Sequence, residues 1–256
     1  MSPSESSSRP AVLVTGASRG IGRAIALQLA QRGCRVAVHY QHNRAMAEAV
    51  LAELAGTGHR TFAADLADPE AVARLWDEVS AAMGPIAVVV NNAGVYLFHP
   101  LPGTGYGEWQ EAWRRTLDTN LFGPANLCHQ AGCAMVAAGG GRVVSISSRG
   151  AFRGEPEAPA YAASKAGLNV LSQSLARALA AQGVYFYVVA PGWVATDMAN
   201  SHLAGPAGAE ILAQHPLGRV ANPEEVAAAA VFCALDAPAA MTGCIIDVNG
   251  ASYLRT

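Results

Sequence analysis

The chain has 256 residues, of which 52% are hydrophobic and 14% are charged, so it can bury a sizeable core. A net charge of -2 gives no reason to expect nucleic acid or an anionic membrane as a partner. Residues 1–9 are polar and Ser-rich, which predicts a flexible tail rather than a signal peptide. No apolar run approaches the roughly 20 residues that span a bilayer. We therefore expect a cytoplasmic protein.

Short apolar runs rich in Val and Ile alternate with longer Ala-, Leu- and Glu-bearing stretches along the chain. The runs predict strands at 11–15, 35–40, 60–64, 86–91, 142–147, 184–190 and 244–248. Three helix starts are chemically marked, by Asn43 before 44–56, by Asp68-Pro69, and by Asn222 before 223–235. Continuous apolar strands separated by helices predict a doubly wound α/β (Rossmann) sheet of about seven parallel strands, with helices on both faces.

The alternation of predicted strands and helices continues along the whole chain and indicates its domain organisation. No composition shift or repeat divides 10–256, so we expect one catalytic domain after the tail. Two segments interrupt the rhythm: 98–108, with two Pro and three Gly, and 191–222. Long irregular segments in compact domains are usually functional, and both follow strand ends where such sheets bind ligands.

Cysteine and histidine spacing gives no metal site. The five cysteines form no C-x-x-C pair and lie among apolar neighbours, as buried thiols of a reducing compartment do. His39 and His42 are three residues apart but have no third candidate ligand nearby. We expect no bound metal.

A glycine-rich turn follows the first predicted strand. Residues 15–22 read TGASRGIG and lead directly into a helix with apolar periodicity. Gly16, Gly20 and Gly22 let the backbone approach a pyrophosphate, and the helix start offers free N–H groups. The segment therefore predicts a dinucleotide site.

The end of the second strand bears on which dinucleotide binds. An NAD site usually has an acid there, whereas the 2'-phosphate of NADP favours Arg. Residues 38–44 contain no acid, and Arg19 of the glycine turn can reach the same phosphate. We therefore expect NADP(H), with Tyr40, Asn43 and Arg44 as further contacts. For Arg44, a plain solvated charge at a helix start is an equal alternative.

Seven motifs in order resemble the short-chain dehydrogenase/reductase family over residues 10–250. They are TGASRGIG, Asp65-Leu66, Asn91-Asn92-Ala93-Gly94, Asn120, Ser148, Tyr161-x-x-x-Lys165 and Pro191-Gly192. The resemblance implies a cofactor site lined by Gly16, Ser18, Arg19, Gly20, Ile21, Gly22, Leu66 and Val194. It implies that Asp65 contacts the adenine, that Asn92, Ala93 and Gly94 form the cofactor floor, and that Pro191-Gly192 passes the nicotinamide. It also implies that Thr196 bonds the carboxamide, that Asn120 holds a water beside Lys165, and that the protein is a homotetramer or homodimer.

The chemistry of the reacting residues can be argued from the sequence itself. Lys165 is the only lysine among 17 basic residues, and it follows Tyr161 by four positions, on one helix face. Its charge is expected to lower the pKa of the Tyr161 phenol from near 10 toward neutrality. Ser148, rather than Ser147, is expected to donate to a substrate carbonyl oxygen. Ser148, Tyr161, Lys165 and Asn120 are thus the candidate catalytic residues.

These features predict an NADPH-dependent carbonyl reductase for a small-molecule substrate. The segments 211–219 and 247–250 look most like 3-oxoacyl-[acyl-carrier-protein] reductases. Those reductases typically offer basic residues where this chain has 139–141 (GGG) and Gln182, which argues against docking of an acidic carrier protein. Cyclic, aromatic, sugar or steroid ketones and secondary alcohols remain alternatives, and a non-catalytic NADP(H) sensor is a more distant one. Arg149 and Arg153 are open to two interpretations, an anion contact or ordinary solvated loop charges.

Overall fold

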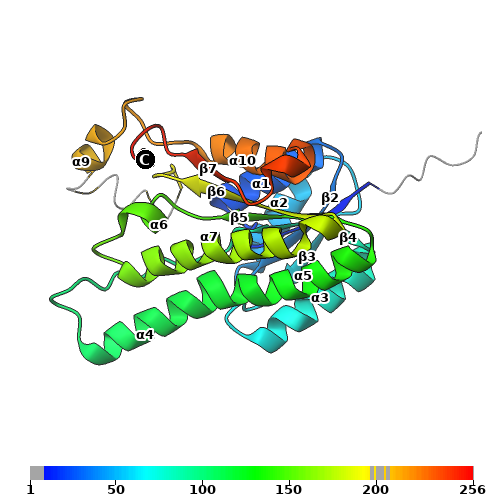
Figure 1. The fold of residues 1–256 in the computed structure, drawn as a ribbon, viewed down its shortest axis with the longest axis horizontal. Coiled ribbons are helices and arrows are strands. Elements are labelled where there is room, and N and C mark those ends of the chain that lie inside the picture. Colours follow the sequence, from blue (N-terminus) through cyan, green and yellow to red (C-terminus); the bar gives the residue numbers. More distant parts are fainter. Residues whose placement is uncertain (1–8, 197–198, 200–204, 206–207, 256) are drawn as a thin grey trace, which may run out of the picture.

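Seven parallel strands form one sheet in the order β3-β2-β1-β4-β5-β6-β7. The computed structural model describes residues 9–196, 199, 205 and 208–255 (Figure 1). The strands are β1 (Ala11–Val14), β2 (Arg35–Tyr40), β3 (Arg60–Ala63), β4 (Ile86–Asn91), β5 (Gly141–Ile146), β6 (Val184–Pro191) and β7 (Ile245–Val248). The predicted strands and the predicted doubly wound sheet are confirmed, with every strand end within one residue of its predicted position.

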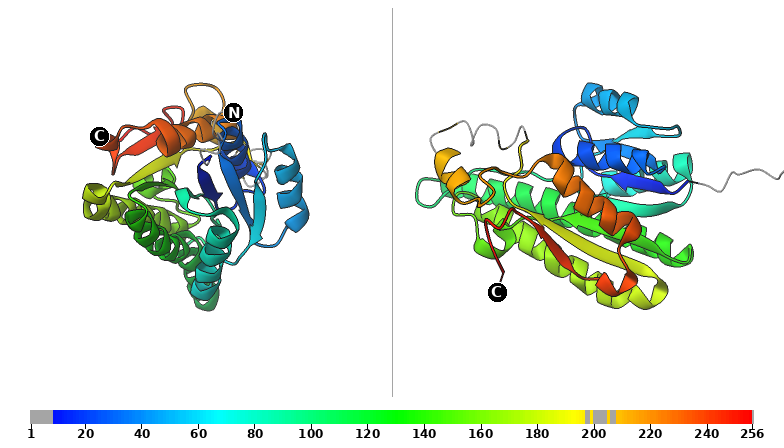
Figure 2. Two further views of the ribbon diagram at one scale, coloured as in Figure 1. Left: turned by 90° about the vertical axis from the view of Figure 1, so that its right-hand side faces the viewer. Right: turned by 90° about the horizontal axis from the view of Figure 1, so that it is seen from above.

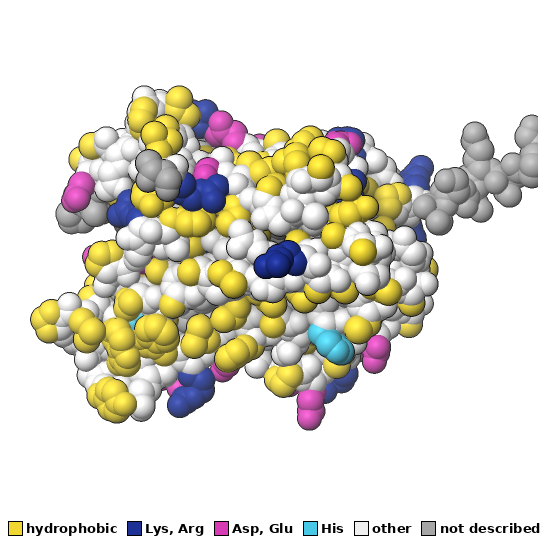
Figure 3. All heavy atoms as spheres, in the orientation of Figure 1, with side chains coloured by type: hydrophobic (Ala, Val, Ile, Leu, Met, Phe, Trp, Pro, Cys, Tyr) yellow, Lys and Arg dark blue, Asp and Glu magenta, His cyan; other side chains and the backbone are white. Residues whose placement is uncertain are grey.

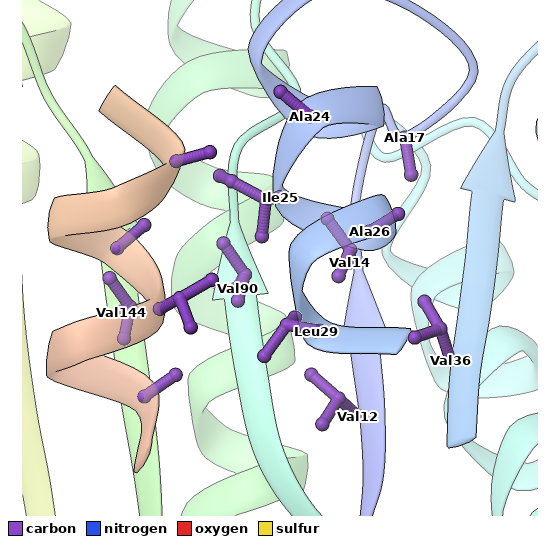
Figure 4. Packing of buried hydrophobic residues seen from close by; sticks show 14 of the residues in the cluster. Val12, Val14, Ala17, Ala24, Ile25, Ala26, Leu29, Val36, Val90 and Val144 are labelled. Carbon is purple, nitrogen blue, oxygen red and sulfur yellow. The ribbon is translucent and has the colours of Figure 1, made fainter. Parts of the chain in front are cut away.

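Helices cover both faces of the sheet (Figure 2). The helices of one face are α1 (Gly20–Gln31), α2 (Arg44–Glu53) and α10 (Pro223–Val231), and those of the other are α3 (Pro69–Met83), α5 (Gly123–Ala137) and α7 (Pro159–Leu179). Because side chains alternate along a strand, Val12 and Val14 pack on the first face and Leu13 on the second. In Figure 4, Ile25 and Leu29 of α1 lie over this first face. Burial on both faces explains the continuous apolar strands.

Helix starts follow the predicted capping residues. The Asn43 side chain accepts a hydrogen bond from Met46 N at 3.0 Å, and the Asp68 carboxylate accepts one from Glu70 N at 2.9 Å. The Glu225 carboxylate accepts one from Asn222 N at 2.8 Å. Such bonds satisfy N–H groups that the first turn of a helix leaves without partners.

Two predicted helix ends are corrected by the structure. The helix expected over 44–56 ends at Glu53, because Leu54 turns into an extended conformation and is buried. The helix expected over 223–235 is α-helical only to Val231 and continues as a π-helical turn, η3 (Phe232–Asp236). Burial of a side chain at the first end therefore overrides the helical pattern.

The first irregular segment is anchored to the start of α7. It stays irregular to Gly105, after which α4 (Tyr106–Leu117) begins. His99 is buried, its N–H donates to Glu157 O at 2.8 Å, and its Nε2 accepts from Ala160 N at 3.2 Å. The segment is thereby held beside the helix that carries Tyr161.

The second irregular segment is described only in part. It contains the short helix α9 (Gly208–Ala213) and a bridge between Val194 and Ala221. Residues 197–198, 200–204 and 206–207 of this segment and residues 1–8 of the predicted tail lie outside the described residues. Within the described ranges, the helices are too short or too polar to cross a membrane.

Candidate active site

A cavity of about 540 Å³ lies at the carboxyl ends of the strands, a size typical of sites for small molecules. Its walls come from segments that follow β1, β2, β3, β4, β5 and β6 in turn. The order of strands reverses between β1 and β4, which is where ligands bind in open parallel sheets. The position of the cavity thus follows from the topology.

The glycine turn forms one end of the cavity. Gly16 and Gly20 have φ of +61° and +55°, which side chains rarely tolerate. A Cβ added to Gly22 would lie 2.3 Å from Gly16 O. The turn therefore requires glycine, and it leaves its backbone open at the start of α1 as a pyrophosphate requires.

Thr15 and Asn92 fix the turn to the adjacent strand β4. The Thr15 hydroxyl oxygen accepts from the N–H groups of Asn92 and Ala93 at 2.9 and 3.0 Å. The Asn92 side-chain amide donates to Thr15 O at 2.8 Å and to Gly16 O at 3.1 Å. Asn92 thus forms part of the cavity floor, and its side-chain amide is hydrogen-bonded to the glycine turn.

His39 is a site residue that the sequence analysis considered only as a metal ligand. It is 2% exposed and lines the cavity. Its Nδ1 accepts from Gly16 N at 3.0 Å, and its Nε2 bonds Ala64 O at 3.1 Å, as the donor. The neutral ring therefore joins the glycine turn to the end of β3, next to Asp65. In the sequence, only the position of His39 near the end of the second predicted strand could have indicated that it belongs to the site.

The buried His39 predicts acid sensitivity. Burial lowers its pKa from 6.5 to about 4, so the unfolded chain binds a proton at higher pH than the folded protein does. Stability is therefore complete above pH 6.5 and is lost as the pH falls toward 4, by up to about 3 kcal/mol. The test is urea unfolding of the wild type and of His39→Gln across this window. The stability difference between them should shrink as the pH falls, and parallel curves would contradict the assignment.

Ser148, Tyr161 and Lys165 all line the cavity. The Ser148 hydroxyl forms a hydrogen bond with the Tyr161 phenol and accepts from Gly150 N at 3.0 Å. Lys165 is buried, and its Nζ lies 5.7 Å from the centre of the Tyr161 ring and donates to Ile146 O at 2.8 Å. The three side chains therefore meet where β5 ends and α7 begins.

The two adjacent serines have different partners. The Ser147 hydroxyl is buried and donates to Lys165 O at 3.3 Å, which ties β5 to α7. Ser148 is only partly buried and bonds the phenol of Tyr161. The geometry thus gives Ser147 a structural partner and leaves Ser148 beside the phenol.

The expected lowering of the Tyr161 pKa is wrong for this structure. Burial raises the pKa of Tyr161 to about 12, although the hydrogen bond with Ser148 acts in the opposite direction. Burial also lowers the pKa of Lys165 to about 8. The ammonium is directed at Ile146 O and lies over the ring. Desolvation, which the sequence does not reveal, therefore decides the pKa of the phenol.

Asn120 lies behind the cavity wall, on a π-helical turn, η1 (Asp118–Phe122). Its Oδ1 accepts from Val95 N at 2.8 Å, and its Nδ2 donates to Val95 O at 2.9 Å and to the Ser164 hydroxyl at 3.2 Å. A Cβ added to Gly94 would lie 3.2 Å from Asn120 Oδ1 and 3.4 Å from Lys165 Nζ. Asn120 thus holds the segment after β4 against Lys165, and the water implied by resemblance stays a prediction.

Most of the other predicted cofactor residues also line the cavity. They are Gly16, Ser18, Arg19, Gly20, Ile21, Gly22, Asn43, Asp65, Leu66, Asn92, Ala93, Gly94, Pro191, Gly192, Val194 and Thr196. Tyr40 and Arg44 are not among the lining residues, and Arg44 Nε instead donates to Glu48 at 2.7 Å, one turn along α2. The structure therefore supports the solvated alternative for Arg44. Lining residues that the sequence analysis missed include Gln41, Met46, Tyr96, Thr119, Glu155 and Trp193.

A parallel sheet with a glycine turn after β1 and a cavity at its switch point defines a Rossmann-type protein. The family model described as enoyl-(acyl carrier protein) reductase matches residues 16–251. A 3-oxoacyl-[acyl-carrier-protein] reductase FabG of Staphylococcus aureus is 38% identical over 244 residues, which cover 94% of this chain and 97% of that protein. D-threitol dehydrogenase of Mycolicibacterium smegmatis is 38% identical over 245 residues, or 95% and 92% of the two chains. The FabG reductase of Escherichia coli is 37% identical over 243 residues, or 94% and 96%. The chain belongs to the short-chain dehydrogenase/reductase family of oxidoreductases.

Proposed function

We propose that the protein is an NADPH-dependent carbonyl reductase that converts a ketone to a secondary alcohol. The observation that carries this proposal is the meeting of Ser148, Tyr161 and Lys165 in the cavity that the glycine turn also lines. A proton donor, the Tyr161 phenol, and a turn suited to binding a dinucleotide thus line the same cavity. Reduction of a carbonyl group needs both.

The residues around the carbonyl oxygen of the substrate have separate roles in the proposed reaction. NADPH, when bound, supplies the hydride to the carbonyl carbon. The Ser148 hydroxyl donates a hydrogen bond that orients the oxygen as negative charge develops. With a pKa of about 12, the Tyr161 phenol is protonated at neutral pH and can give its proton to that oxygen. The nearby Lys165 ammonium stabilises the phenolate that remains.

The preference for NADPH rests on the charges around the end of β2. Arg19 is exposed and lines the cavity, and neutral Gln41 and Asn43 line it beyond β2. A carboxylate there would repel the 2'-phosphate, whereas a free guanidinium pairs with it. Arg19 is therefore the proposed phosphate contact.

Replacement of Arg19 tests this preference directly. Arg19→Ala should raise the KM for NADPH roughly tenfold to a hundredfold, because a hydrogen-bonded charge pair is lost. The KM for NADH, which lacks the phosphate, should change much less. Arg44→Ala is the matched control, since Arg44 pairs with Glu48 outside the lining, and it should have little effect on either. Equal losses with both cofactors would contradict the assignment.

Two substrate classes follow from the relatives. The FabG relatives suggest 3-oxoacyl thioesters, and the threitol dehydrogenase relative, as identical as the Staphylococcus aureus FabG, suggests a polyol oxidised at a secondary alcohol. Carrier-protein docking is disfavoured, because the turn before β5 has glycine where a basic residue would dock. A Cβ added to Gly140 would lie 2.9 Å from Gly183 O, so larger side chains fit poorly there.

A cofactor-coupled assay tests the proposal. NADPH oxidation should be measured with acetoacetyl-CoA and with cyclic, aromatic and steroid ketones, and NADP+ reduction with D-threitol and other polyols. Turnover of a ketone supports the reductase, and preferential polyol oxidation supports the alternative. Tight NADPH binding without turnover of any compound would overturn the enzyme proposal in favour of a sensing protein.

An apolar face supports assembly into a homodimer or homotetramer. In Figure 3, apolar side chains spread over the face formed by α4, α5 and α7, with few charged groups among them. Phe122, at the end of η1 between α4 and α5, and Val170 of α7 are 53% and 61% exposed. Large exposed apolar side chains grouped on one face mark interaction sites. We propose this face as the interface between copies of the chain.

A further inference from the structure

Arg149 is a buried cation that the reaction described above does not use. The residue is 3% exposed, which excludes the interpretation as a solvated loop charge. Its Nη2 donates to Gln214 Oε1 at 3.0 Å, whereas Nη1, also buried, has no hydrogen-bond partner among the described residues. A buried charge without full pairing is costly, so such a group calls for an anionic partner.

The surroundings of Arg149 do not supply that partner. Arg153 Nη1 donates to the same Gln214 oxygen at 3.1 Å, so two guanidinium groups share one neutral acceptor. In the part of the chain that the structure describes, neither guanidinium forms an ion pair with Asp or Glu. Glu155 lines the same cavity and acts on Arg149 only from beyond ion-pair distance. The site therefore holds two guanidinium groups, with Glu155 as a nearby carboxylate that acts on both but forms an ion pair with neither.

Arg149 is fixed immediately beside the reacting groups. It follows Ser148 in the chain, and its N–H donates to Pro191 O at 2.8 Å, which holds it between β5 and β6. The next residue, Gly150, donates its N–H to the Ser148 hydroxyl. Arg149 lines the cavity together with Ser148 and Tyr161. If the carbonyl group of a substrate contacts Ser148, the atoms next to that carbonyl group therefore lie near the part of the cavity wall that Arg149 forms.

We propose, resting on the carbonyl reductase function, that Arg149 determines specificity by binding a carboxylate of the substrate, which is then an oxo acid. A guanidinium is a planar fork of donors that matches the two oxygens of a carboxylate. The carboxylate provides the acceptor that Arg149 Nη1 lacks. Gln214 holds the fork in place from the other side.

Paired substrates that differ only in charge test this inference. The pairs are pyruvate, acetoacetate and levulinate, each compared with its methyl ester, in steady-state assays with NADPH. The wild type should have a higher kcat/KM for the acid in at least one pair. In Arg149→Gln, the acid-to-ester ratio of kcat/KM should fall roughly tenfold to a hundredfold, as expected for loss of a hydrogen bond to a charged group. Arg149→Lys, which keeps the charge, should retain part of the preference.

Arg153→Gln is the matched control, because Arg153 is exposed and is not among the lining residues. It should change the acid-to-ester ratio much less than Arg149→Gln does. A wild type that reduces esters or neutral ketones but prefers no acid would overturn the inference and leave the reductase function intact. Absence of turnover with every carbonyl compound would instead remove the proposed function.

A measurement on the wild type alone covers the case in which Arg149→Gln does not fold. Succinate and glutarate should inhibit reduction of a neutral ketone competitively, and their dimethyl esters should inhibit much more weakly. Equal inhibition by the acids and the esters would overturn the inference. Circular dichroism and urea unfolding of each variant identify loss of the fold.

Discussion

Tyr161→Phe should lower kcat by roughly a hundredfold to ten-thousandfold, the contribution typical of a positioned proton donor. The change removes one oxygen and leaves the ring, which packs against Tyr96 at 5.0 Å between centroids. The dissociation constant for NADPH should change by no more than about tenfold, because at most one hydrogen bond to the cofactor is lost. Steady-state kinetics and NADPH fluorescence titration measure the two effects separately.

Tyr96→Phe is the matched control for this result. Tyr96 also lines the cavity and carries a phenol, and its ring packs against that of Tyr161. It has no proposed role in proton transfer. Its loss of kcat should be far smaller than that of Tyr161→Phe. Undiminished turnover by Tyr161→Phe would refute the mechanism.

Lys165→Arg should be nearly as damaging, although it preserves the positive charge. Lys165 is 4% exposed, and its Nζ is confined by Ile146 O at 2.8 Å and by the Gly94 backbone and Asn120 around it. A guanidinium is wider than an ammonium and does not fit this space, and overpacking of a buried site costs about 1–3 kcal/mol. We expect kcat to fall roughly a hundredfold, since both the cation and the Tyr161 ring are displaced.

Arg177→Lys, the reverse exchange at an exposed position of the same helix, is the control. It should leave both turnover and the free energy of unfolding unchanged. Steady-state kinetics and urea unfolding of the two variants give the comparison. Wild-type kcat in Lys165→Arg would show that charge alone suffices at this position.

Much of the fold was readable from the sequence because its signals are local. The short apolar runs of the strands and the capping residues Asn43, Asp68 and Asn222 depend only on near neighbours in the chain. The same is true of the glycine turn and of the four-residue spacing between Tyr161 and Lys165, which places them on one helix face. Parallel pairing then follows from the intervening helices.

The electrostatics of the site depend instead on residues far apart in the chain. His39 accepts from Gly16 and Arg149 donates to Gln214, contacts that only the folded chain creates. Burial by distant segments raises the pKa of Tyr161 and turns Arg149 from a loop charge into a candidate anion contact. Composition and spacing therefore identify the reacting groups, but desolvation, which sums over the whole tertiary structure, sets their protonation and charge.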